Sequence, residues 1–295
     1  MHQYLRDLEY ILTHGEDRQD RTGVGTKSVF SLTSRYNLRK TFPAVTTKPL
    51  AWKAMVSELL WFIEGSTDER RLAEILHGTR DSNKKTIWSG NANADYWKPK
   101  AHFEGDLGKV YGYQWRNWES FNQLSKSEDD LVTGNYIHID QLQNLIDNLK
   151  NKPHDRRHIL SAWNPGQLDE MALPACHIMS QFYVNLHNEL SCQMYQRSAD
   201  FFLGVPFNIA SYSLLTHIIA QVCGYKVGDF IHVVGDAHIY NNHIEQVETQ
   251  LSRTPLALPT LNIDKSIDNI NNFTMDSFSL NNYNSLESIK ALMAV

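Results

Sequence analysis

The sequence predicts an α+β fold, because helical and strand-like runs follow one another without the regular alternation of βαβ units. Apolar residues at helical spacing predict helices at 4–12, 52–63, 139–149, 207–225 and 242–251. Alternation typical of strands occurs at 28–38, 158–163, 178–185, 190–198 and 229–236. No linker separates these segments, so we expect one domain over 1–295, with an insertion-like loop region at about 78–107.

Several of these elements have recognisable ends or faces. Gly15 follows the first helix as a stop, and Gly224 ends the helix at 207–225. The helix at 52–63 is apolar on nearly every side, which predicts that it is buried. Ser66 followed by Glu69 resembles a capping box and predicts the start of a further helix.

The strand at 190–198 shows two different faces. Leu190, Cys192 and Met194 face one way, whereas the intervening polar residues face the other. We therefore expect one face of this strand in the core and the other occupied by polar groups.

Composition places the chain among ordinary globular proteins. Hydrophobic residues make up 42%, charged residues 21%, and the formal net charge is -5. Without a basic run the chain has no footprint for nucleic-acid binding, so no nucleic-acid partner is expected. No apolar signal core opens the sequence and no run reaches membrane-spanning length, which predicts a cytoplasmic protein without membrane attachment.

The cysteines and histidines do not indicate a metal site. The chain has three cysteines and no CxxC pair, which argues against a disulfide scaffold and a structural zinc site. His238 and His243 lie close together beside an acid, but their spacing matches no ligand signature. We therefore predict no metal.

Cys176, in the stretch LPACHIM, is the first candidate for chemistry. Pro174 favours an extended Leu173 and places the cysteine at the entrance of a strand, where a side chain can reach a cleft. Free cysteine is also among the most buried residue types, so position alone allows either a core thiol or a nucleophile. Cys192 and Cys223 look structural, one within a strand and the other late in a helix.

Arginines are the second candidate group: Arg21, Arg156, Arg157 and Arg197. Ordinary surface ion pairing explains them equally well. However, Arg197 precedes Ser198, and a guanidinium with a hydroxyl is well suited to phosphate. The RTGVGT stretch lacks the glycine spacing of a phosphate-binding loop and is interpreted as a turn that presents Arg21.

Two further polar residues have both structural and functional interpretations. Glu58 shares an apolar helix face, so it is either paired for stability or tuned for proton transfer. Asn208 begins the helix after Pro206 and is either a helix cap or an amide that reads a base edge.

Eight motifs occur along the chain: DRTGVGT, FPAVTTK, SELLWF, VYGYQWR, DRRHILSAWNP, LPACH, QRSADFFLGVPFNIASY and GDAHIYNNH. Taken in combination, they resemble those of the folate-dependent thymidylate synthases, whose nucleophile is cysteine. The resemblance runs from the N-terminal helix to the final valine. It implies a mixed sheet packed by helices and a homodimer formed sheet to sheet.

The resemblance also implies a reaction. In this family the cysteine, here Cys176, adds to C6 of dUMP and activates C5. A one-carbon unit from 5,10-methylenetetrahydrofolate is then transferred to C5 and reduced to a methyl group, which yields dTMP and dihydrofolate. The folate is both carbon donor and reductant, so no nicotinamide, flavin or metal is required.

Residues that match the family motifs acquire implied roles toward dUMP. Arg21, Arg197 and Ser198 hold the phosphate, while Arg156 and Arg157 reach it from the other subunit. This positive cluster is expected to lower the pKa of Cys176.

Asn208 is expected to read O4 and N3–H of uracil together, a pattern that cytosine reverses. His238 and Tyr240 contact the ribose hydroxyl. Glu58 organises proton transfer around O4, and Tyr111 belongs to the removal of the C5 proton.

The resemblance implies that another set of residues binds the folate. Asp200 binds the pterin, Trp88, Leu173 and Val295 line or close over the folate, and Lys48 meets its glutamate tail. Two departures affect this side. Ser89-Gly90 follows Trp88 where the family usually has an acid, and Lys109 replaces the proline expected before Val110.

The sequence leaves three alternatives to the implied reaction. A dUMP hydroxymethylase would quench the intermediate with water instead of hydride, and a cytidylate hydroxymethylase would disagree with Asn208. A non-catalytic nucleotide- or RNA-binding protein would not need the intact set of Cys176, Glu58, Asn208 and arginines.

Overall fold

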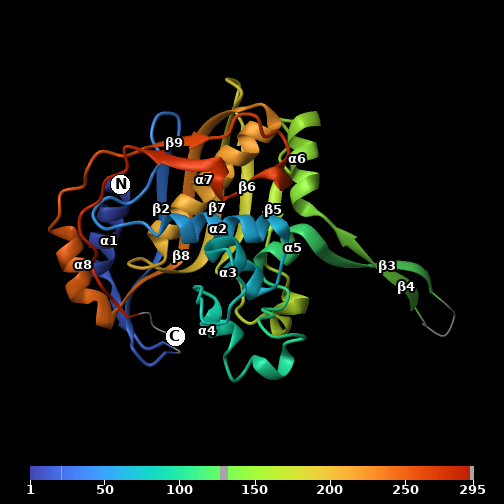
Figure 1. Ribbon diagram of the computed structural model, residues 1–295, viewed down its shortest axis with the longest axis horizontal. Coiled ribbons are helices and arrows are strands. Elements are labelled where there is room, and N and C mark those ends of the chain that lie inside the picture. The colour runs from blue at the N-terminus through green and yellow to red at the C-terminus, as the bar shows by residue number, and fades with distance from the viewer. Residues whose placement is uncertain (21, 127–131, 293–295) are drawn as a thin grey trace.

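The computed structural model describes residues 1–20, 22–126 and 132–292, and its architecture is α+β, as predicted (Figure 1). Within these ranges the main sheet has six strands in the order β1-β2-β8-β7-β6-β5. Its strands are β1 (Glu16–Arg18), β2 (Thr26–Asn37), β5 (Ile159–Ser161), β6 (His177–Val184), β7 (Glu189–Asp200) and β8 (Lys226–Tyr240). The β7–β8 pair is parallel and the other neighbours are antiparallel, so the sheet is mixed.

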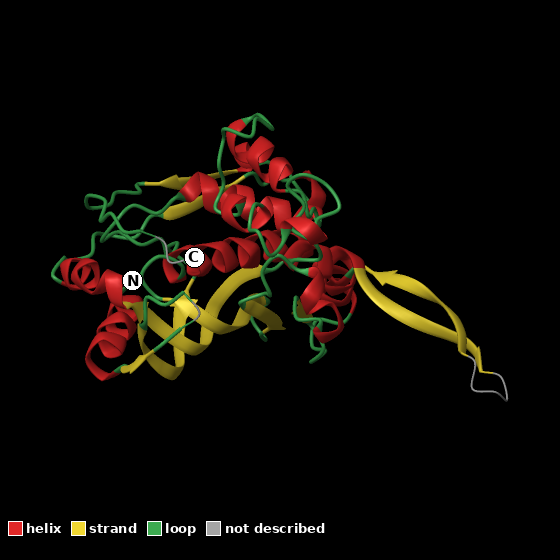
Figure 2. Ribbon diagram, turned by 90° about the horizontal axis from the view of Figure 1, so that it is seen from below, coloured by secondary structure: helices red, strands yellow, loops and turns green. Residues whose placement is uncertain are grey.

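Most of the helices lie on one side of this sheet (Figure 2). They are α1 (His2–His14), α2 (Trp52–Glu64), α3 (Glu69–His77), α4 (Ser89–Ala92), α5 (Tyr111–Asn117), α6 (Gln141–Asn151), α7 (Val205–Cys223) and α8 (Ile244–Leu251). The long helix α7 contacts β7 and β8, and α2 contacts both α5 and α7. These three helices and the neighbouring strands enclose the site described below.

The two central helices end as expected from their glycines. Gly65 and Gly224 follow α2 and α7 in the left-handed conformation, with φ angles of 74° and 76°. In α2 the run from Met55 to Ile63 is buried on every side, as its composition predicted. On β7, Leu190, Cys192 and Met194 are buried, whereas Gln193 on the opposite face is exposed.

Two local expectations were wrong. The cap of α3 is Asp68, which accepts from the Arg70 N–H, rather than a Ser66–Glu69 box. Ile139 ends a strand instead of opening a helix, because Asp140 caps α6 through the Gln143 N–H.

Two strand pairs lie outside the predicted elements. One is the hairpin of β3 (Trp118–Lys126) and β4 (Val132–Ile139), which projects away from the sheet and helices (Figures 1 and 2). The other pairs β9 (Thr260–Ile263) with β10 (Phe278–Asn281). The predicted loop region at 78–107 holds α4 and a single 3₁₀ turn at Lys98–Lys100 among its turns. Within the ranges given above, no helix is both long and apolar enough to cross a membrane.

Candidate active site

Cys176 lies immediately before β6 and is partly exposed. Its backbone N–H donates to the Tyr111 hydroxyl at 2.7 Å, and Arg197 Nη2 lies 3.8 Å from its Sγ. The same guanidinium donates to the carbonyls of Ala175 and Pro174, at 2.8 and 2.9 Å. Arg197 therefore holds the loop before the cysteine and places a positive charge beside the thiol.

Burial opposes activation of this thiol. It raises the pKa of Cys176 more than the Arg197 charge and the contact with Tyr111 lower it, so the net shift is upward. Of the arginines in the expected cluster, Arg197 acts on Cys176 in the chain as described, and it lowers this pKa as expected. Cys192 is fully buried in β7, and burial also raises the pKa of Cys223, to about 12.

Glu58 is a buried carboxylate on α2, and Trp88 Nε1 donates to its Oε1 at 2.7 Å. Burial raises the pKa of Glu58 to about 7, while the hydrogen bond from Trp88 lowers it. A carboxyl group that titrates near neutrality can both donate and accept a proton at physiological pH. Burial, rather than a nearby charge, creates this property.

Tyr111 on α5 connects Cys176 to an aromatic cluster. Its ring stacks on His177 with 4.1 Å between centroids, and His177 Nδ1 lies 2.7 Å from the Tyr212 hydroxyl. Burial, aided by His232, lowers the pKa of His177 to about 3, so this imidazole is neutral. Burial also raises the pKa of Tyr111 well above its ordinary value.

Asn208 lies in the first turn of α7, whose N-cap is Gly204, so it is not the cap. Its Oδ1 accepts from Gln196 Nε2 at 3.1 Å, and Gln196 Oε1 lies 2.9 Å from His232 Nε2. Because an amide oxygen only accepts, His232 donates to Gln196, which in turn donates to Asn208. This chain orients the Asn208 amide so that its NH₂ group faces away from Gln196.

The predicted phosphate residues separate into two places. Arg197 and Ser198 lie on β7 beside Cys176, whereas Arg156 and Arg157 are exposed at the start of β5. The Arg156 carbonyl accepts from Gln181 Nε2, well along β6 from Cys176. Within one chain these two arginines therefore do not join Arg197. Arg21 lies outside the described residues.

His238 and Tyr240 lie together near the end of β8, with ring centroids 5.2 Å apart. His238 Nδ1 is 2.9 Å from Asp236 Oδ1, and this contact is the main cause of the lowered pKa of Asp236. His243 Nε2 instead contacts the Leu292 carbonyl at 2.7 Å. In the described part of the chain, no group of three or more His, Cys, Asp or Glu residues could hold a metal ion.

The predicted folate residues are only partly arranged for a ligand. Asp200 Oδ1 accepts from the backbone N–H groups of Phe202 and Leu203, and Leu173 is partly buried against the core. Lys48 is buried, and its ammonium donates to the Phe202 carbonyl at 2.5 Å. This lysine would have to leave that position to meet a glutamate tail. Val295 lies outside the described residues.

Comparisons with known proteins identify the family. The family model described as thymidylate synthase matches residues 2–295. The chain belongs to the thymidylate synthase family. It is 50% identical to the thymidylate synthase of human herpesvirus 8 type P (isolate GK18), over 99% of this chain and 84% of the viral protein. It is 49% identical to the bifunctional dihydrofolate reductase-thymidylate synthase of Zea mays, covering all of this chain and 54% of the plant protein.

The prediction drawn from the eight motifs is thereby confirmed. The chain is an enzyme of the methyltransferase class, and the co-substrate of its family is 5,10-methylenetetrahydrofolate. The match covers 54% of the maize relative, which is about twice as long as this chain.

The Lys109 departure has a structural explanation. The Lys109 backbone N–H donates to the Glu170 carbonyl at 2.9 Å, a bond that proline could not make. Its ammonium is 2.8 Å from carboxylate oxygens of both Glu119 and Glu170. A backbone bond and two ion pairs therefore hold the segment that leads into Tyr111.

Four residues around the site were not singled out from the sequence: His177, Gln196, Tyr212 and His232. His177 and Gln196 are neighbours of Cys176 and Arg197 within the quoted motifs, which is the signal that could have found them. Tyr212 is the last residue of the motif that begins with Gln196, so the same signal applies to it. His232 gives no local signal, because Ile231 and Val233 flank it and only the packing brings it to the site.

Proposed function

We propose that this chain catalyses the reductive methylation of dUMP to dTMP, with 5,10-methylenetetrahydrofolate as donor and dihydrofolate as the second product. The observation that supports it most is the placement of the Cys176 thiol 3.8 Å from the Arg197 guanidinium and in backbone contact with Tyr111. A nucleophile, a phosphate-binding cation and a group for proton transfer thus lie at one point.

The proposed reaction begins with the Cys176 thiolate. Its sulfur forms a bond to C6 of uracil, and the electrons of the C5–C6 double bond move toward O4 as an enolate. Burial raises the thiol pKa, so the thiolate forms by loss of the proton to solvent and is stabilised by the Arg197 guanidinium 3.8 Å away.

Glu58 and Tyr111 have the proton-handling roles in this proposal. Glu58, with a pKa of about 7, exchanges a proton at O4, directly or through water. The Tyr111 hydroxyl, held against the Cys176 backbone, takes part in removal of the C5 proton. The cysteine leaves C6 when the double bond re-forms, so the enzyme is regenerated without net change.

Folate recognition is proposed for Trp88, Leu173, Asp200 and Val295, with Lys48 for the glutamate tail. The Trp88 ring, the Leu173 side chain and a carboxylate held by two backbone N–H groups suit a flat heterocycle with hydrogen-bond donors. When bound, the folate supplies both the one-carbon unit and the hydride.

Uracil recognition is proposed for Asn208. The orientation enforced through His232 and Gln196 leaves the Asn208 NH₂ group available to donate to O4, while Oδ1 has a second lone pair for N3–H. Cytosine presents the opposite pattern at these two atoms. We also propose that His238 and Tyr240 contact the ribose.

We further propose a homodimer in which Arg156 and Arg157 complete the phosphate site of the partner, beside Arg21, Arg197 and Ser198. Two features support it: these arginines lie away from Cys176 in their own chain, and the open face of the sheet exposes Phe30 and Tyr183. One catalytic domain over 1–295 and a cytoplasmic location remain part of the proposal.

The product assay tests the reaction directly. The protein is incubated with [5-³H]dUMP and methylenetetrahydrofolate, and tritium release, dTMP and dihydrofolate are measured together. Equal amounts of all three are expected. Formation of 5-hydroxymethyl-dUMP without dihydrofolate would identify a hydroxymethylase, and preference for dCMP would contradict the role of Asn208.

Mixing two inactive variants tests the shared site. A Cys176→Ala chain and an Arg156→Ala/Arg157→Ala chain are unfolded and refolded together. Random pairing should restore about a quarter of the wild-type sites, because each mixed dimer contains one complete site. No recovery, despite mixed dimers shown by mass, would contradict the shared arrangement.

A further inference from the structure

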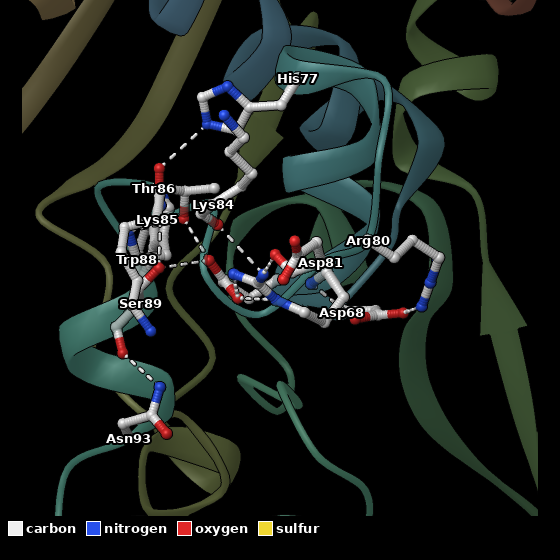
Figure 3. A network of polar contacts seen from close by, with 12 residues as sticks. Asp68, His77, Arg80, Asp81, Lys84, Lys85, Thr86, Trp88, Ser89 and Asn93 are labelled. Carbon is white, nitrogen blue, oxygen red and sulfur yellow. Dashed lines mark hydrogen bonds and ion pairs between the residues drawn. The ribbon is translucent and has the colours of Figure 1, made fainter.

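Three side chains of helix α3 hold the segment at 81–89. Glu69 and Arg70 lie at the start of the helix, and His77 lies at its end. Arg70 Nη1 donates to the carbonyls of Asp81 and Lys84, at 2.7 and 3.1 Å. His77 Nε2 lies 3.1 Å from the Lys85 carbonyl. Figure 3 shows these contacts, with the segment folded against the helix and Trp88 beyond it.

Glu69 makes the innermost of these contacts. Its Oε1 accepts from both Thr86 Oγ1 and Ser89 Oγ, each at 2.6 Å. The same hydroxyl oxygens accept from backbone N–H groups of the turn: Thr86 Oγ1 from Trp88 at 3.2 Å, and Ser89 Oγ from Thr86 at 2.8 Å. One carboxylate oxygen thus closes a four-residue turn whose third member is Trp88 (Figure 3).

The burial of Glu69 indicates that its carboxylate depends on its hydrogen-bonding partners. This residue is 1% exposed, and a buried carboxylate needs charged or hydrogen-bonding partners. Arg70 Nε supplies the charge at 2.6 Å from the second oxygen, Oε2. Burial raises the pKa of Glu69, but the bonds from Arg70, Ser89 and Thr86 outweigh it, so the group is ionised.

Trp88 connects this turn to the proposed chemistry through its indole N–H on Glu58. The ring packs against Trp61 and Tyr111, with centroids 6.0 and 5.9 Å away. Packing of this kind holds the plane of the ring, whereas the direction of the N–H also depends on the backbone of the turn. Ser89, one of the anchors, is also where the chain departs from the family pattern.

We infer that Glu69 is a positioning residue, which anchors the Thr86–Ser89 turn and thereby keeps the Trp88 indole N–H on the Glu58 carboxylate. The inference rests on the proposed function only for the catalytic importance of Glu58. The contact geometry from Glu69 to Glu58 stands independently of it.

The direction of the effect follows from the groups around Glu58. Tyr111 on α5 and Tyr212 on α7 interact electrostatically with it, and burial keeps both phenols neutral. The Trp88 hydrogen bond therefore stabilises the carboxylate, and its loss would raise the pKa of Glu58 further. Loss of the Glu69 charge alone, without movement of Trp88, would act in the opposite direction.

The experiment follows the carboxyl group of Glu58 by infrared spectroscopy over pH 5–9. Its C=O band is identified by its disappearance in Glu58→Gln, and its midpoint in the wild type is expected near pH 7. In Ser89→Ala and Thr86→Val, which change no charge, the midpoint should rise by roughly half to one pH unit. Glu69→Gln should shift it in the same direction.

Two matched variants serve as controls. Thr86→Ser keeps the hydroxyl and should keep the wild-type midpoint. Glu74→Gln removes a partly exposed carboxylate from the same helix, where it pairs with Arg71, and should not shift the midpoint. Near-UV circular dichroism checks that each variant is folded before its titration is measured.

The outcomes separate the inference from the proposed function. An unchanged or lowered midpoint in folded Ser89→Ala and Thr86→Val would overturn the positioning role, whether or not Glu69→Gln folds. Because the titration needs no substrate, it remains decisive if the wild type forms no dTMP. Conversely, normal dTMP formation in the wild type leaves the proposed function intact when the midpoint does not move.

Discussion

The buried site and the β3–β4 hairpin differ in which side chains they bury and which they expose. Around Cys176, polar groups are buried and matched one to one, as in the His232–Gln196–Asn208 chain. On the hairpin, large apolar side chains are exposed instead: Leu124 is 70% exposed and Tyr136 67%. The first region depends on contacts between distant segments, and the second on its own two strands.

This difference predicts where the chain tolerates change. A buried polar group that loses its partner pays the full cost of desolvation, which also alters the pKa values of its neighbours. On the hairpin, Phe121 and Tyr136 contact each other in an edge-to-face pair, and the pair contributes to local order only. Function should therefore respond to single atoms in the site and hardly to whole side chains on the hairpin.

The largest effect is expected from Cys176→Ala. Without the sulfur no bond to C6 can form, so kcat should fall by at least about a thousandfold. Initial rates of dTMP formation measure it. Cys223→Ala is the matched control, because that half-buried thiol ends α7 away from the site and its loss should leave the rate unchanged. Equal activity of both variants would show that Cys176 is not the nucleophile.

Glu58→Gln should lower kcat by about a hundredfold or more and abolish the pH dependence that the carboxyl group imposes near neutrality. In the wild type, the change of kcat with pH that this carboxyl group causes should have its midpoint at about pH 7. If kcat of the variant still changes with pH around this midpoint, another group causes the pH dependence.

The same substitution should alter stability in a pH-dependent way. The folded-state pKa of Glu58 lies above its unfolded value, so the folded protein retains a proton that the unfolded chain has lost. Wild-type stability should therefore fall as pH rises from about 4.5 to about 7, by about 3 kcal/mol for this group, relative to Glu58→Gln. Urea unfolding of both proteins at pH 5 and pH 8 measures the difference.

Asn208→Ala is expected to act on selectivity more than on structure. Loss of the paired donor and acceptor should reduce the preference for dUMP over dCMP by roughly ten- to a hundredfold in kcat/KM. Competition between the two nucleotides in one reaction gives the ratio directly. An unchanged ratio would mean that another group reads the base edge.

The smallest effects belong to the hairpin. Phe121→Ala and Tyr136→Ala should each change the free energy of unfolding by less than about 1 kcal/mol and leave kcat unchanged, because these rings pack mainly on one another. Thermal melts and initial rates test both. A loss of activity comparable to that of Asn208→Ala would show that the hairpin and the site are coupled.

Much of the helical framework could be predicted from the chain. The buried α2 and the glycine after α7 follow from composition over one or two turns, which is local information. The hairpin escaped prediction because its strands mix polar and apolar residues on each face; on one face, Phe121 pairs with Tyr136 but Glu119 with His138. The cap at Asp68 was missed because Ser66 offered an equally plausible pattern.

Residue identities and motif order determined the family and the candidate residues, since both are properties of the linear sequence. Only the tertiary structure decided how those residues behave: the net upward pKa shift of Cys176, the near-neutral pKa of Glu58 and the separation of Arg156 from Arg197. The reason is physical. Desolvation and hydrogen bonding depend on every segment packed around a group, and Glu58, Trp88 and Glu69 meet only after α2, α3 and the 81–89 segment have folded together.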